Sequence, residues 1–172
     1  KMHTIKAADI PLVRFRDKGT PADNLSNYNS AEERMLYVAP VGQIRTDRLL
    51  FVTKSSMCKL VEGAEFDVAK RTIASTKLAE VTLQDDVVDL NNKVVVEYND
   101  LLAEDDELIF IGGSAEMEQI VLQSHGGCFL RFLKQEISIM KKTAIGVRGM
   151  KLAGDDYLEH AYLLAGHQEY TI

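Results

Sequence analysis

Three pairs of neighbouring aspartates and two histidines are the side chains of this sequence with the most potential for chemistry. They are Asp85-Asp86, Asp105-Asp106, Asp155-Asp156, His160 and His167. Paired carboxylates can share general-acid and general-base work, and histidine with carboxylates can bind a divalent metal. Two of the aspartate pairs, Asp105-Asp106 and Asp155-Asp156, however, mark repeated turns, and Asp is a common turn residue because its side chain bonds to nearby backbone groups. We therefore interpret the pairs as structural turn residues.

The surroundings of these residues complete neither a catalytic nor a metal-binding arrangement. His160 and His167 have no cysteine or carboxylate cluster that would complete a zinc site. The tyrosines lie in or beside expected strands and turns, where amphipathic side chains are common. The glycine turn at Gly126 precedes no helix that could bind phosphate at its N-terminus. We expect this chain alone to be non-catalytic, with no cofactor and no metal site.

The two cysteines, Cys58 and Cys128, fall in matching strand segments. Free cysteine behaves as a small apolar residue, so we predict two reduced thiols in the core. A disulfide is the alternative, but nothing else in the sequence indicates an oxidising compartment.

Basic residues gather in three loops, residues 14–21, 69–78 and 140–152, of a chain whose net charge is −6 and whose pI is about 5.2. That balance argues against strong indiscriminate binding to a polyanion, which needs concentrated Lys and Arg. The three clusters nevertheless occupy equivalent places, and a row of such loops would form an electrostatic track for a phosphate backbone. Solvated turns are the alternative interpretation. The predicted phosphate contacts are Arg14, Arg16, Lys18, Lys70, Arg71, Lys141, Lys142 and Arg148.

The basic loops belong to a repeated block. Each block starts at an acidic turn (Glu32-Glu33, Asp105-Asp106 or Asp155-Asp156), and the third block is not completed. Two apolar strands, a tight turn, a strand with a basic residue, a short acidic-apolar pair and a basic loop follow in order. The expected strands are residues 35–38, 49–53, 58–61, 108–111, 119–122 and 130–133, with residues 3–6 as a further copy of the strand that carries a basic residue. Stacked repeats of this kind place equivalent loops on one extended surface, which is often the binding surface.

These segments are short runs of Val, Ile, Leu and Phe broken by Gly, Asn and Asp, which is typical of strands. Helical periodicity is weak, so we predict an all-β fold of antiparallel sheets. A β-hairpin over residues 81–98, turning at Asn91-Asn92, explains why one copy is longer than the other. The approximate copies are residues 1–28, 29–102, 103–152 and 153–172 of a single domain or fragment.

The apolar runs are of strand length and too short to cross a bilayer, and no secretory signal precedes them. The 172 residues could bury one core or form a short array of repeats. Because the sequence starts with Lys1, we expect it to be part of a longer protein.

Three segments resemble the C-terminal domain of bacterial type IIA DNA topoisomerase A subunits, those of DNA gyrase and topoisomerase IV. Residues 49–60, LLFVTKSSMCKL, are similar to the family's LLLVTKxGxxKR hairpin. Residues 140–152, MKKTAIGVRGMKL, are similar to its MGRxARGVRGIKL segment, and Gly154-Asp155-Asp156 follows as in the family. Residues 18–25, KGTPADNL, are similar to its KGxPIVNLL.

The resemblance implies a β-pinwheel, a propeller-like disc whose four-stranded blades exchange strands, here a partial array of about three blades. It implies a non-catalytic domain whose basic rim bends double-stranded DNA and presents it for strand passage. The parent enzyme would be an ATP-dependent topoisomerase in the bacterial cytoplasm. The partners of this domain would be double-stranded DNA, the rest of the A subunit and the ATPase B subunit. The ATP and Mg²⁺ of the enzyme would be held by other domains, and no membrane contact is expected.

Two features of the sequence differ from the gyrase pattern. The glutamine-arginine-glycine box that marks gyrase is absent from these residues, so the resemblance leaves gyrase and topoisomerase IV activity open. In the middle copy, Ala74-Ser75-Thr76 replaces most of the Gly-Val-Arg-Gly segment. A protein-binding propeller-like module without affinity for DNA is the alternative function.

Overall fold

Short antiparallel strands make up most of the regular structure. The computed structural model describes residues 1–69, 71–74, 76, 80–81, 104–166 and 169. The strands are β1 (Met2–His3), β2 (Arg48–Thr53), β3 (Met57–Glu62), β4 (Thr72–Ile73), β5 (Glu80–Val81), β6 (Glu104–Asp105), β7 (Leu108–Gly113), β8 (Gln119–Ser124), β9 (Phe129–Leu133), β10 (Val147–Arg148) and β11 (Leu158–Leu164). The helical segments are α1 (Val41–Thr46) and four 3₁₀ turns: η1 (Ala7–Asp9), η2 (Ala22–Asn24), η3 (Gly63–Phe66) and η4 (Lys134–Glu136).

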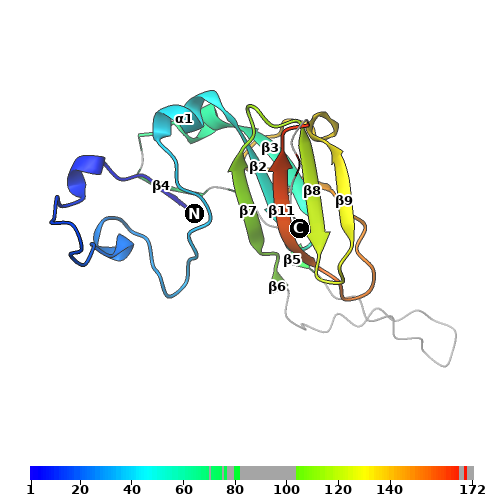
Figure 1. Ribbon diagram of the computed structural model, residues 1–172, viewed down its shortest axis with the longest axis horizontal. Helices are drawn as coiled ribbons and strands as arrows, with labels where there is room; N and C mark the ends of the chain where they lie inside the picture. Colours follow the sequence, from blue (N-terminus) through cyan, green and yellow to red (C-terminus); the bar gives the residue numbers. More distant parts are fainter. Residues whose placement is uncertain (70, 75, 77–79, 82–103, 167–168, 170–172) are drawn as a thin grey trace, which may run out of the picture.

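Two sheets lie face to face (Figure 1). The first has the strand order β10-β3-β2-β7 and the second has the order β11-β8-β9. Their ladders are antiparallel, as are the two short pairs β1-β4 and β5-β6. The prediction of a mostly β fold with antiparallel sheets is therefore confirmed.

Each of the two larger sheets is completed by a strand from the following copy of the repeat. β7 follows the second acidic turn, yet it pairs with β2 of the copy before it. β11 follows the third acidic turn and pairs in the same way with β8. One copy alone therefore leaves an edge and a face uncovered, which is the reason that such repeats stack.

An aspartate of each of these two acidic turns fixes the exchanged strand in place. The Asp106 carboxylate accepts hydrogen bonds from the Ser55 backbone N–H at 2.9 Å and from the Ser55 hydroxyl. Asp156 accepts from the Gly126 N–H at 2.9 Å, in the equivalent turn of the next copy. Bonds from Ser124 and Gly126 hold the pKa of Asp156 below its usual value. These two aspartates therefore act as structural turn residues, and Asp85-Asp86 lie outside the described residues.

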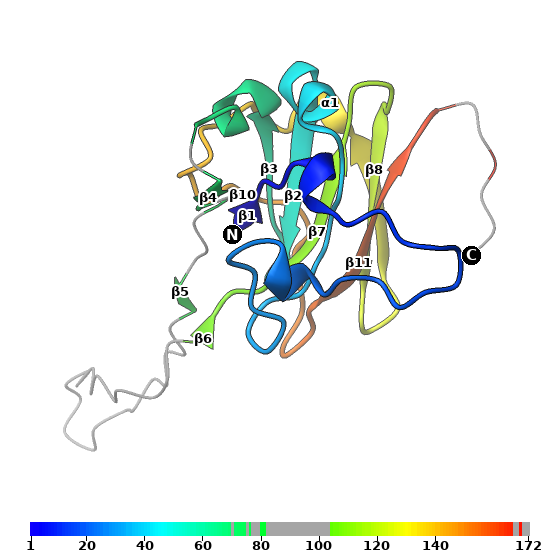
Figure 2. The ribbon, with the colours of Figure 1, turned by 90° about the vertical axis from the view of Figure 1, so that its left-hand side faces the viewer.

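Both faces of β2 are buried, which explains its unbroken apolar run. Leu50 and Val52 face the second sheet and pack in one core with Leu122 of β8. Leu49 and Phe51 face the other way, into a second core that includes residues of the N-terminal segment. Figure 2 shows that segment in front of β2 and β7. A strand between two cores has no solvated face and loses the alternation of a half-exposed strand.

The structure confirms most of the predicted strands and corrects two. Residues 49–53, 58–61, 108–111, 119–122 and 130–133 lie in β2, β3, β7, β8 and β9. Residues 3–6 form strand only at His3, in β1. Residues 35–38 were expected to be a strand and are not one. β7 and β11 each form a ladder with a strand of the copy before them. Among the described residues, no strand forms a ladder with residues 35–38. The hairpin predicted for residues 81–98 lies outside the described residues, apart from Val81.

The two cysteines differ in environment. Cys58 is fully buried in the core between the sheets, as predicted, and burial raises its pKa to about 12. Cys128 is exposed, so its prediction as a core thiol is wrong. It directly follows the turn at Gly127 and precedes β9, whose side chains are only partly covered. Both thiols are free.

The Asp106 contact predicts a measurable loss of stability. Asp106→Ala removes the buried carboxylate that accepts the hydrogen bond of the Ser55 N–H. The free energy of unfolding should therefore fall by about 1–3 kcal/mol. Urea unfolding followed by circular dichroism measures it. The control is Asp155→Ala, at an exposed aspartate of the third acidic turn, where a change below about 0.5 kcal/mol is expected. Equal losses in the two variants would contradict the assignment.

Candidate nucleic-acid interface

The third basic loop lies along the outer edge of β3. The Met140 N–H bonds to the Leu60 carbonyl at 2.8 Å at one end of the strand, and the Gly149 N–H bonds to the Ser56 carbonyl at 2.8 Å at the other. Between these points β10 pairs with the start of β3. The loop therefore forms the edge of the first sheet, and Lys141 and Arg148 are exposed on it.

Two glycines let the loop approach β3 this closely. Gly146 has a φ of +113°, and a Cβ atom there would lie 2.7 Å from the Cys58 carbonyl oxygen. A Cβ at Gly149 would lie 2.7 Å from the Cys58 sulfur and 2.8 Å from Leu122. The Gly-Val-Arg-Gly sequence thus has a packing reason, since the loop backbone approaches the Cys58 backbone at Gly146 and the Cys58 and Leu122 side chains at Gly149.

A buried lysine reaches into the same loop from β3. Lys59 is 1% exposed, and its ammonium group donates to the carbonyls of Lys142 at 2.6 Å and Ala144 at 2.7 Å. Burial lowers the pKa of Lys59 to about 8, against the opposite influence of the Glu65 carboxylate. The sequence indicated only a basic residue in a strand; it gave no sign that this residue is buried.

Glu65 binds the loop from the outer side. Its carboxylate accepts from the Lys142 N–H at 3.0 Å and lies 3.4 Å from the Lys141 ammonium group. The bond from Lys142, followed by the charge of Lys141, lowers the pKa of Glu65. The preceding copy has an ion pair in the equivalent place, because Asp9 lies 3.5 Å from Arg71 of the second basic loop. In both copies, the acid after the hairpin pairs with a predicted contact residue of the next basic loop.

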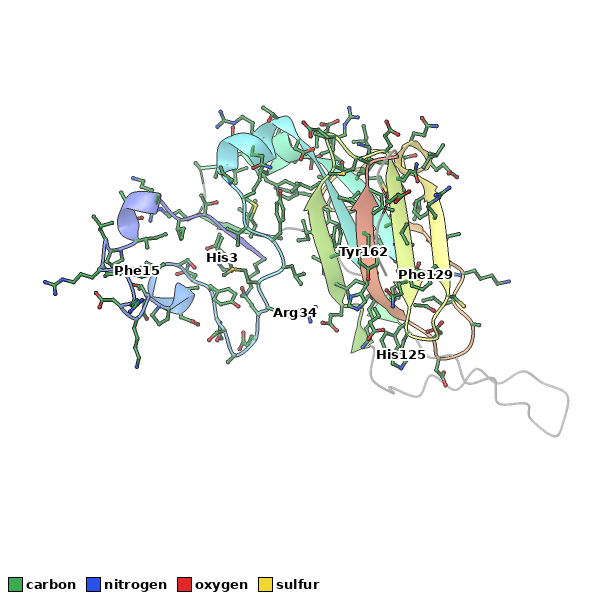
Figure 3. All side chains as sticks on the ribbon, viewed as in Figure 1. His3, Phe15, Arg34, His125, Phe129 and Tyr162 are labelled. Carbon is green, nitrogen blue, oxygen red and sulfur yellow. The ribbon has the colours of Figure 1, made fainter. Side chains whose placement is uncertain are left out.

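The first basic loop is placed differently. Arg14, Arg16 and Lys18 are exposed, and Figure 3 shows Phe15 of the same loop on the outer side of the N-terminal segment, away from both sheets. The loop turns at Arg16, whose φ is +76°, and the Asp17 carboxylate accepts from the Arg14 N–H. It has no sheet edge beside it among the described residues.

The structure therefore brings together some of the predicted contacts and separates others. Lys141, Lys142 and Arg148 share the β3 edge, while Arg71 lies directly before β4, which pairs with β1. Lys70 lies outside the described residues. Lys151 was not among the predicted contacts, although it is exposed in the same loop.

The first acidic turn binds β1 instead of a hairpin turn. The Glu33 carboxylate lies 2.7 Å from the Lys1 ammonium group and 2.7 Å from Nε2 of His3. These two partners lower the pKa of Glu33. The three side chains border a cavity of about 630 Å³ whose other walls are largely apolar, including Phe51 of β2. Since the polar groups bond to one another, we interpret them as a structural contact between β1 and the acidic turn.

Within the described ranges, no group of three or more His, Cys, Asp or Glu side chains could hold a metal ion. His160 lies near the ring of Tyr162 on β11, and His167 lies outside those ranges. No helix in the described part of the chain is long and apolar enough to span a membrane.

The fold and this edge define a repeat domain of exchanged antiparallel sheets that carries basic loops on its strand edges. Residues 118–165 match the family described as "DNA gyrase C-terminal domain, beta-propeller". The A subunit of DNA gyrase from Klebsiella oxytoca is 42% identical over 157 residues, 91% of this chain and 15% of that protein. The A subunit of DNA topoisomerase 4 from Streptococcus pneumoniae is 27% identical over 157 residues, 90% of this chain and 16% of that protein.

Among solved structures, that of the E. coli ParC C-terminal domain superposes with a TM-score of 0.53 at 13% identity, covering 87% of this chain and 53% of that one. The chain belongs to the family of C-terminal β-pinwheel domains of DNA gyrase and topoisomerase IV A subunits. It spans only about 15% to 16% of the length of the full-length relatives described above.

The glycine contacts lead to a prediction for the edge. Gly146→Ala combines a disfavoured φ with a collision against the Cys58 carbonyl, so it should cost about 1–3 kcal/mol of unfolding free energy and shift the amide resonances of residues 141–149. Gly19→Ala in the first basic loop is the matched control, because a Cβ there meets nothing within 4 Å. Urea unfolding and a two-dimensional NMR spectrum give the result. A neutral Gly146→Ala would show that the loop does not pack against β3.

Proposed function

We propose that this chain is a non-catalytic DNA-binding and DNA-bending module of a type II DNA topoisomerase A subunit. The observation that carries the proposal is the third basic loop, which lies along the outer edge of β3 with Lys141 and Arg148 exposed. Arg71 beside the β1-β4 pair supports it, because an equivalent loop meets an equivalent strand there. The proposed contacts are backbone phosphates, so binding is independent of sequence and favours duplexes that bend easily.

The proposal for the parent enzyme follows from the family. The module presents a bent duplex to the cleavage domain for strand passage, and the ATPase B subunit supplies the ATP-driven step. ATP and Mg²⁺ are held by other domains, and the enzyme acts on chromosomal DNA in the bacterial cytoplasm.

A second candidate, docking of a protein partner, has one observation in its favour. Leu12, just before the first basic loop, and Phe15 within it are 103% and 90% exposed, which is unusual for large apolar side chains. The two candidates differ in their dependence on DNA. Bending needs a duplex long enough to follow the edge, whereas a protein-docking loop ignores duplex length.

Fluorescence anisotropy with a duplex of about 40 base pairs, repeated over a series of salt concentrations, tests the proposal. Each phosphate contact contributes about 0.9 to the slope of log K against log salt. Lys141→Gln with Arg148→Gln should therefore weaken binding to any sequence and reduce the slope by about 2. A duplex of about 12 base pairs should bind more weakly than the longer one, since fewer phosphates are neutralised.

The control is Arg34→Gln with Lys54→Gln, which changes the net charge equally. Both side chains lie against Glu107, just before β7, at the edge of the first sheet opposite β10 (Figure 3 labels Arg34). This control should keep the wild-type slope. Equal effects of the two double variants would mean that only net charge matters, and no binding of the wild type at about 50 mM salt would refute the DNA function.

A further inference from the structure

Lys59 cannot act as a phosphate contact, because its side chain is 1% exposed. Its charge is directed inward, at two carbonyls of the third basic loop. A buried ammonium group is costly unless its donors are satisfied, and the loop satisfies them with backbone oxygens. The two carbonyls belong to residues that surround Thr143, so both must turn toward the same point. This requirement leaves the loop few alternative conformations.

The loop is held from its other side by Glu65. Glu65 bonds to the Lys142 N–H, while the carbonyl of the same residue receives Lys59. The peptide groups on both sides of Lys142 are thus fixed, one by an anion and one by a cation. The direction in which Lys141 and Lys142 leave the backbone follows from these two bonds.

The other copies provide a comparison within the chain. The equivalent strands also carry a basic residue: His3 of β1, six residues before its acid as Lys59 is before Glu65, and Arg131 of β9, one position later than Lys59 when counted from the hairpin turn. Nδ1 of His3 lies 3.4 Å from the Thr72 hydroxyl, in the basic loop that pairs with β1. Arg131 is exposed, and in the described part of the chain β9 pairs with β8 alone. Where a basic loop covers the strand, the basic residue contacts that loop.

We propose that Lys59 is the positioning residue of the third basic loop: its buried ammonium group holds the conformation in which Lys141 and Lys142 are presented to a phosphate backbone. This inference rests on the proposed function and deepens it. It assigns the charges of the site to two tasks: the exposed Lys141 and the half-buried Lys142, whose ammonium group donates to the Glu65 carbonyl at 3.2 Å, bind phosphate, and the buried Lys59 shapes the loop. The Lys59 ammonium nitrogen also lies 5.3 Å from the centroid of the Phe51 ring, which covers it from the β2 side.

The test compares Lys59→Met with Val61→Ala. Met keeps the length of the side chain and removes its donors, while Val61 is buried two residues further along on the same face of β3, in the core that contains Phe51. Lys59→Met should increase amide hydrogen exchange at residues 141–146 about tenfold relative to β2 and β8, weaken duplex binding about fivefold and reduce the salt slope by about 2. Val61→Ala should lower overall stability and leave the relative loop exchange and the salt slope unchanged.

A titration of the wild type by NMR keeps the inference testable if Lys59→Met does not fold. Amide resonances of residues 143–146 should move with a midpoint near pH 8, the pKa of Lys59. The other charged groups around Lys59 are Glu65 on η3 and the side chains of Lys141 and Lys142 on the loop. Glu65 is ionised through this range because its pKa is lowered.

The outcomes separate this inference from the proposed function. If the wild type binds no duplex, the DNA function fails, and the exchange and titration experiments still decide the role of Lys59. If the wild type binds DNA but Lys59→Met keeps both its loop protection and its salt slope, the positioning role is refuted. An equal increase in hydrogen exchange of the third basic loop in Lys59→Met and in Val61→Ala would refute it as well, because a general loss of stability would then explain the effect.

Discussion

The exchange of a strand between successive copies is the constraint on which the rest of this structure depends. β2 has a hairpin partner, β3, and needs a second neighbour, which it takes from β7 of the next copy. β8 takes β11 in the same way. A shift of one residue in such a ladder would turn every side chain to the opposite face, so the register must be specified. The bond between Asp106 and the Ser55 N–H does so, because it joins the exchanged strand to one position of the hairpin turn.

Strand exchange also determines where charge can be placed. Once β7 occupies one side of β2, the free edge of that hairpin is β3, and the basic loop of a later segment pairs there through β10. A loop on an edge is partly solvated, so exposed lysines cost little. Its inner side meets backbone and core, where glycine and a fully bonded Lys59 are tolerated. The same edge therefore needs small residues and a buried cation inside, and exposed cations outside.

The sequence allowed the strands to be predicted wherever the signal is local. β2, β3, β7, β8 and β9 are short runs of apolar residues bounded by turn residues, and each was expected. Residues 35–38 have a similar composition and form no strand, because a strand needs a neighbour and composition does not report one. The α1 helix is six residues long, too short for a helical period to be visible.

The contacts of the candidate interface could not be predicted from the sequence for a related reason. The bond from Lys59 to the Lys142 carbonyl joins residues 83 positions apart, and Glu65 meets the Lys142 N–H across 77. No local pattern distinguishes a strand lysine that faces solvent from one that faces a distant loop, and only the register of the exchanged sheets determines which occurs.

The acidic balance of the chain acts at a different range from the interface. At physiological salt, exposed charges are screened beyond about 8 Å, so the net charge of −6 acts weakly on a phosphate in contact with the β3 edge. The acids that matter are the nearest, Glu65 at 3.4 Å from Lys141 and Asp9 at 3.5 Å from Arg71. Exposed pairs of this kind contribute only about 0–1 kcal/mol, so a phosphate can take over the lysine at little cost. Under the proposed function, Glu65 keeps the loop ordered while DNA is absent and yields Lys141 when it is present. The bond from the Lys142 N–H to Glu65 and the bonds from Lys59 to the loop carbonyls persist through that change, which is why loop shape and phosphate binding can be assigned to different charges.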